Sequence, residues 1–144
     1  MTGECMKSID TASAVKKADE LFQSGWNCAE SVFIAVHSQA ASGEAPVQLV
    51  TGLGGGMGCK RTCGAVSGAQ VALGLVFGRT TADEAAKKIA MAKASALCKA
   101  FRVTYHSLDC WELTSGFDSD ADRRRYCTSL VTTAVELACE AIAD

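Results

Sequence analysis

The sequence predicts an all-α fold, arranged as one compact domain of six to seven helices over residues 1–144. A chain of 144 residues is long enough for a single domain with a real core. Proline occurs once, at Pro46, and no segment alternates polar and apolar residues long enough to predict a strand. Apolar residues recur instead at helical spacing along most of the chain.

The first two helices are predicted over residues 10–24 and 27–40. The first has one apolar face, and Gly25 follows it as a residue suited to end a helix. The second begins at Asn27, whose side chain can cap it, and Glu30 stands three residues later as the capping-box partner. Val32, Phe33 and Val36 form its apolar face.

A short third helix is predicted from about Pro46 to Leu53, and a glycine-rich loop then leads into a fourth helix over 63–77. The fourth helix is rich in small residues. Glycine inside a helix costs about 1 kcal/mol relative to alanine. Three glycines in this helix, Gly64, Gly68 and Gly74, therefore predict close packing by neighbouring groups.

The remaining helices are predicted over about 82–103, from near Cys110, and over about 120–143. Thr81 and Glu84 have the spacing of a capping box for the first of these. Asp109 and Glu112 have the same relation around Cys110. Three aspartates near the start of the last helix suit its dipole.

Charge and hydropathy exclude several classes of protein. The net charge of −2 gives no electrostatic footprint for nucleic acid. The first ten residues lack the basic and apolar runs of a signal peptide. The longest apolar run, around residues 69–77, is too short to span a bilayer, so we expect no membrane insertion. A cytoplasmic protein is the default expectation.

The stretch "GLGGGMGCKRTCGAVSG" at 52–68 resembles a phosphate-binding loop at first sight. A P-loop, however, requires Gly-Lys-Ser/Thr, and a dinucleotide fingerprint requires a glycine where Met57 stands. Both motifs also follow a strand, and none is predicted. The glycines are explained more simply as a tight turn before a helix start that favours an anion.

The chain contains eight cysteines, and three of them fall at or near predicted helix starts. Cys28 follows Asn27, Cys63 follows Thr62, and Cys110 follows Asp109, each a good cap residue. Free N–H groups and the helix dipole favour the thiolate there, which predicts lowered thiol pKa values. The plain alternative is a small buried residue beside a cap, but three matched cases favour a function.

The other cysteines divide by their surroundings. Cys127 lies on the apolar stripe of the last helix and can supply a fourth sulfur if the three helix starts converge. Cys98 and Cys139 are predicted to be core residues. Cys59 is a candidate fifth ligand, a resolving thiol or an exposed bystander, and the pattern assigns no role to Cys5. His106 could accept a proton or bind metal.

These residues resemble the redox-active protein family named for its cysteine pattern, C_GCAxxG_C_C. The family's CGAxxG motif corresponds to residues 63–68, and matching flanks are "GWNCAES" at 25–31, "ALGLVFG" at 72–78, "DCWEL" at 109–113 and "YCTSLV" at 126–131. The resemblance places the family's four characteristic cysteines on Cys28, Cys63, Cys110 and Cys127. It implies redox activity without a specified reaction, and Cys59 is an addition to the usual pattern. Similar modules stand beside iron–sulfur centres in some multihaem proteins, which favours cluster binding by analogy.

We therefore expect a redox protein that holds an iron–sulfur cluster, or a related iron site, through these four cysteines. Its role would be electron transfer or redox sensing for a partner protein, rather than that of a stand-alone enzyme. A structural zinc site is ranked lower because paired Cys-x-x-Cys knuckles are absent. Alternatives are a metal-free thiol/disulfide oxidoreductase and an interaction protein with buried cysteines. Small-residue helix faces fit a homodimer and intrachain packing equally well.

Overall fold

The computed structural model describes residues 8–144, which fold into an all-α single domain. Its α-helices are α1 Thr11–Gln23, α2 Cys28–Ala40, α3 Gly64–Phe77, α4 Glu84–Tyr105, α5 Cys110–Thr114 and α6 Asp120–Ala143. Three short turns connect α2 to α3, namely η1 Val47–Leu49, η2 Thr51–Leu53 and η3 Gly56–Lys60. Within the described range no helix is both long and apolar enough to cross a membrane.

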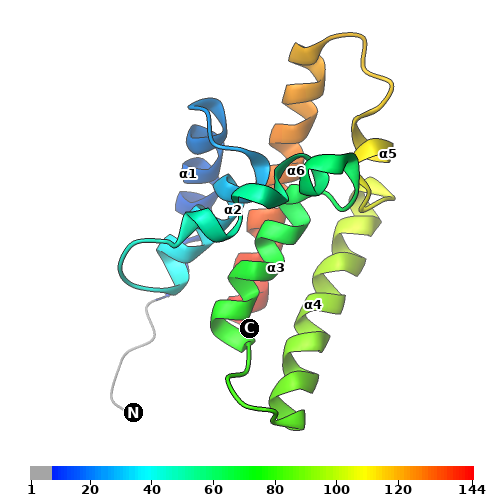
Figure 1. The fold of residues 1–144 in the computed structure, drawn as a ribbon. Coiled ribbons are helices and arrows are strands. Elements are labelled where there is room, and N and C mark those ends of the chain that lie inside the picture. Colours follow the sequence, from blue (N-terminus) through cyan, green and yellow to red (C-terminus); the bar gives the residue numbers. More distant parts are fainter. Residues whose placement is uncertain (1–7) are drawn as a thin grey trace.

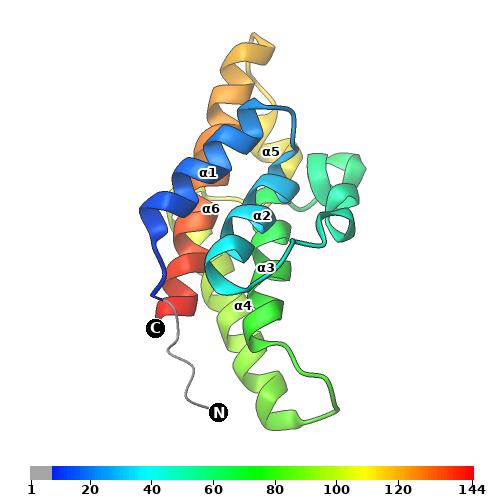
Figure 2. The same ribbon diagram turned by 90° about the vertical axis from the view of Figure 1, so that its left-hand side faces the viewer.

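Helices α2, α3 and α6 pack against one another at the centre, as Figures 1 and 2 show. Helix α1 covers α2 and α6, while α4 lies at the edge and packs against α3 and α6. The core between them is built from small and β-branched side chains around two fully buried phenylalanines, Phe33 and Phe101. Alanines and Gly68 at the α2–α3 contact allow the two backbones to approach closely.

Local signals predicted several helix ends correctly. Gly25 follows α1 with φ of 112°, as the sequence predicts. Asp10, the first residue of the predicted helix, is its cap, since its carboxylate accepts a hydrogen bond from the Ser13 amide. Asn27 caps α2 with the complete capping box that Glu30 predicts. The last helix begins at Asp120, as expected, and the Ser119 side chain caps it.

Two predicted elements differ in the structure. The expected helix over residues 46–53 is two separate 3₁₀ turns, η1 and η2, which meet at Val50. The prediction of a capping box between Thr81 and Glu84 is wrong. Asp83 caps α4 instead, and its carboxylate accepts hydrogen bonds from the amides of Ala85 and Ala86. The capping-box spacing favours Thr81, but α4 begins at Glu84, so the residue in position to cap it is Asp83.

Candidate functional site

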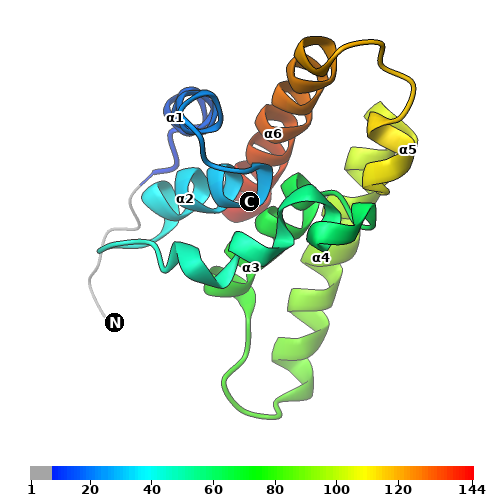
Figure 3. The same cartoon turned by 45° about the horizontal axis from the view of Figure 1, so that its top comes forward.

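Four cysteine side chains from four different helices line one pocket of about 180 Å³. Cys28 is the first residue of α2, Cys63 caps α3, Cys110 is the first residue of α5, and Cys127 lies in the third turn of α6. Figure 3 shows the segment from η2 to η3 beside the start of α3, and η3 contacts α5. Each of the four is a free thiol.

The start of α2 is fixed by a polar triangle that holds Cys28 in place. The buried carboxylate of Glu30 accepts hydrogen bonds from the Asn27 amide at 3.0 Å and from the Thr51 hydroxyl at 2.7 Å. The Asn27 side-chain amide donates to the carbonyl of Thr51 at 3.0 Å. These hydrogen bonds join the cap of α2 to the turn η2. They fix the backbone at Asn27, and Cys28 is the next residue of the chain.

Cys63 and Cys110 are held side by side by a short antiparallel backbone pairing. The Cys63 amide donates to the Leu108 carbonyl at 2.7 Å, and the Cys110 amide donates to the Arg61 carbonyl at 2.6 Å. Between these bonds, Thr62 forms an isolated β-bridge with Asp109. The prediction that Thr62 caps α3 is wrong. Thr62 belongs to the β-bridge, and Cys63 occupies the cap position of α3.

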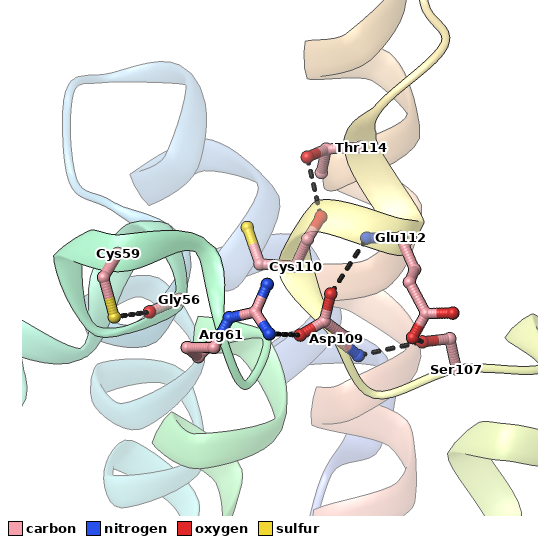
Figure 4. Close-up of polar contacts among 8 residues, drawn as sticks. All are labelled: Gly56, Cys59, Arg61, Ser107, Asp109, Cys110, Glu112 and Thr114. Atoms are coloured by element: carbon pink, nitrogen blue, oxygen red, sulfur yellow. Dashed lines mark hydrogen bonds and ion pairs between the residues drawn. The ribbon is translucent and has the colours of Figure 1, made fainter.

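Helix α5 is only five residues long, and side chains around it fix its position (Figure 4). Asp109 caps it by accepting from the Glu112 amide at 3.0 Å and forms an ion pair with Arg61 at 3.6 Å. Glu112 does not complete the expected capping box, since its carboxylate accepts from the Ser107 hydroxyl instead. These bonds tie α5 to the loop that carries Cys63.

Two glycines of the CGAxxG motif occupy positions where any side chain would collide with a neighbour. A Cβ at Gly64 would overlap the Cys28 sulfur and lie 2.9 Å from the Leu53 carbonyl oxygen. A Cβ at Gly68 would lie 2.6 Å from the Ala29 carbonyl oxygen on α2. The motif thus lets the start of α3 approach α2 at the level of the Cys28 thiol.

Basic side chains share the pocket with the thiols. Lys60, Arg123 and Arg124 are among its lining residues. The Arg124 guanidinium donates to the Phe22 carbonyl at 2.6 Å and lies 4.3 Å above the Phe22 ring, which joins α6 to α1. Arg123 and Arg124 both act to lower the pKa of Cys127. The pocket therefore combines thiol groups with positive charge.

Burial, however, dominates the ionisation of the thiols. It raises the pKa of Cys63 to about 12, reinforced by the neighbouring Cys28 and Cys110 thiols, although the amides of Ala65 and Val66 favour the thiolate. Burial also raises the pKa of Cys28 and of Cys127. The expectation of lowered pKa at Cys28 and Cys63 is therefore wrong, because loss of hydration outweighs the helix N–H groups.

The other sequence candidates lie outside this pocket or outside the described residues. Cys59 is exposed, and Figure 4 shows its sulfur turned toward the Gly56 carbonyl, 3.5 Å away. Cys139 is buried in the core, as predicted, whereas Cys98 is half-buried and accepts a hydrogen bond from the Gln70 side chain. His106 ends α4 in a left-handed conformation, and Cys5 falls outside the described residues.

The four thiols do not make up a preformed ion site in the part of the chain that the structure describes. Within residues 8–144, no group of three or more Cys, His, Asp or Glu side chains is arranged to hold a metal ion. The four thiols instead surround a pocket. Besides burial, which is the main cause, negative charge on Cys28 or Cys110 acts to raise the pKa of Cys63 and of Cys127. They are neighbours across a shared space rather than members of one tight cluster.

Sequence reasoning missed the residues that hold this arrangement together. Thr51 was not singled out, although its hydroxyl and carbonyl both bind the α2 cap. Lys60 lines the pocket, although no local motif of the sequence indicates this. The pairing of 61–63 with 108–110 carries no alternating pattern that would have revealed it.

Comparison with known proteins gives one match. Residues 26–141 match the family model described as "Putative redox-active protein (C_GCAxxG_C_C)". No match was found among curated proteins or among solved structures. The matched range includes all four cysteines of the pocket and the glycines of the 63–68 motif. The chain belongs to the C_GCAxxG_C_C family.

Proposed function

We propose that the protein binds an iron–sulfur cluster through Cys28, Cys63, Cys110 and Cys127 and acts in electron transfer or redox sensing. The observation that carries this proposal is the convergence of four thiols, from four helices, on one pocket. Four cysteine thiolates are the ligand set of [2Fe–2S] and [4Fe–4S] centres, so the donor set fits. A bound cluster of this kind supplies a reversible one-electron couple.

The charges around the pocket support an anionic occupant. A cluster with four thiolates carries net negative charge, and Lys60, Arg123 and Arg124 line the space it would take. Amides at the starts of α2 and α3 face the same sulfurs and favour their anionic form. Hydrogen bonds and positive charge near the sulfurs are among the factors that set the reduction potential of such a centre.

The ionisation of the thiols favours a metal site over metal-free thiol chemistry. A thiol/disulfide oxidoreductase needs a thiolate as its attacking group. Burial raises the pKa of Cys63 to about 12 and also raises that of Cys28, so both are protonated near neutral pH. A bound cation offsets the cost of desolvating thiolates, since coordination deprotonates a thiol.

A structural zinc site is the lower-ranked metal alternative. Four thiolates also suit zinc, but structural zinc sites are commonly built from paired Cys-x-x-Cys knuckles, and the sequence has none.

Anaerobic purification with metal and sulfide analysis tests the proposal. We expect broad visible absorbance with stoichiometric iron and acid-labile sulfide, in the protein as isolated or after reconstitution with ferrous iron and sulfide. Stoichiometric zinc without sulfide would identify a structural zinc site instead. A colourless, metal-free protein in which two thiols exchange with a dithiol couple would identify a thiol oxidoreductase.

A further inference from the structure

Helix α4 presents an apolar stripe to solvent, although it lies at the edge of the domain (Figure 1). The stripe consists of Ala85, Ile89, Ala92, Ala96 and Val103, which are all exposed. Ile89 is 55% exposed and Val103 is 78% exposed. Positions 85, 89, 92, 96, 99 and 103 are alternately four and three residues apart. All of them are apolar except Lys99. This is the spacing by which one helix packs along another.

A row of positive charge runs beside the α4 stripe. Lys88, Lys99 and Arg102 are exposed and lie on the adjoining side of the helix. Among the described residues, none of the three has a carboxylate within ion-pairing distance. Helix α4 carries five basic side chains and one acidic one, in a chain whose net charge is −2. The positive charge is therefore concentrated on this helix.

We propose that this face of α4 is a docking surface for a partner protein that presents an amphipathic helix with acidic flanks. The apolar positions of that helix would pack along the α4 stripe, and its carboxylates would face Lys88, Lys99 and Arg102. Charge complementarity identifies the partner's chemistry and speeds its encounter. Three of the five stripe residues are alanines, whose small side chains allow a second helix to approach closely.

A second copy of the chain and a membrane surface fit the same face less well. In an antiparallel self-pairing of α4 the basic rows of two copies would stand against each other, which costs free energy. An anionic membrane would attract the basic row, but interfacial helices insert bulky Trp, Phe or Leu side chains. The α4 stripe offers three alanines, Ile89 and Val103 instead.

The test uses the full-length protein and two synthetic helical peptides with leucine and alanine at heptad positions. One peptide carries glutamate at the flanking positions, and the other carries lysine. We expect the acidic peptide to bind, with weaker binding at high salt, and the lysine peptide not to bind. Lys88→Glu with Lys99→Glu should weaken binding of the acidic peptide about tenfold. Lys16→Glu with Lys17→Glu on α1 changes the net charge equally and should leave binding unchanged.

Three further results would overturn the proposal. The first is equal binding, or no binding, of both peptides. The second is binding to vesicles of phosphatidylserine and phosphatidylcholine without binding to the acidic peptide. The third is a dimer, seen by sedimentation, that Ile89→Glu dissociates. Because Ile89 is exposed, that variant should remain folded.

Discussion

The first residue of α3, Gly64, touches the sulfur of Cys28, the first residue of α2, so closely that a methyl group could not fit between them. This contact explains why the motif of residues 63–68 begins Cys-Gly. It sets the distance between the starts of two helices that each carry a pocket thiol. The geometry of the pocket therefore requires glycine, which has no side chain, at position 64.

Replacing Gly64 with alanine should destabilise the protein by about 1–3 kcal/mol, because the added methyl group collides with Cys28 and the Leu53 carbonyl. Gly74→Ala is the matched control on the same helix. A Cβ there meets nothing within 4 Å, so that variant should be stabilised by about 1 kcal/mol. Urea unfolding at neutral pH measures both changes, and equal effects of the two substitutions would contradict the close contact.

The buried carboxylate of Glu30 should be important for stability through its two hydrogen bonds. Glu30→Ala leaves the Asn27 amide and the Thr51 hydroxyl without their acceptor and should cost about 2 kcal/mol. Glu20→Ala, at an exposed position on α1, should change stability by less than about 0.5 kcal/mol. In a double-mutant cycle Glu30→Ala and Thr51→Val should be non-additive. Additive effects would show that the two side chains act independently.

Thiol reactivity should follow burial in the metal-free protein. Cys59 is exposed, whereas burial raises the pKa of Cys28 and of Cys63. Iodoacetamide near pH 8 should therefore modify Cys59 well before either of the other two. Mass spectrometry of peptides taken over time gives the order. Early modification of Cys63 would mean that its thiol is ionised, contrary to the structure.

The metal-free protein should lose stability as the pH rises above 9. The pKa of Cys63 is about 12 in the folded state against an ordinary value of 9.0, so the unfolded chain binds fewer protons between these limits. Each such group lowers the free energy of unfolding by about 1.4 kcal/mol per pH unit in that range. Cys63→Ser should show a shallower decline from pH 9 to pH 10.5 in urea titrations. An identical slope would assign the decline to other groups.

The fold could be read from the sequence because its helices carry complete local signals. The Asn27–Glu30 box, Gly25 and the aspartates near residue 120 act over a few residues, so their pattern alone fixes where helices begin and end. Three of the site cysteines follow cap residues, Cys127 lies on the apolar stripe of the last helix, and the family resemblance indicates the same four. The structure brings their side chains to one pocket.

What the sequence could not predict depends on contacts between distant segments. Thr62 resembles a cap residue, but its backbone pairs with Asp109, which lies 47 positions further along the chain. The helix dipole predicts a lowered pKa at Cys63, and only the packing of α2, α3 and α5 around the thiol shows that burial prevails. Depth of burial is a property of the whole fold rather than of a local pattern.

The most direct test of the shared site is the iron and sulfide content of four single variants, Cys28→Ser, Cys63→Ser, Cys110→Ser and Cys127→Ser. The proposal predicts that each loses most of its iron, sulfide and visible absorbance. Cys98→Ser, which alters a half-buried thiol outside the pocket, should keep the wild-type content. Circular dichroism of each variant serves as the control for folding. Wild-type iron and sulfide in the folded Cys28, Cys110 or Cys127 variant would contradict the claim that these thiols hold one cluster.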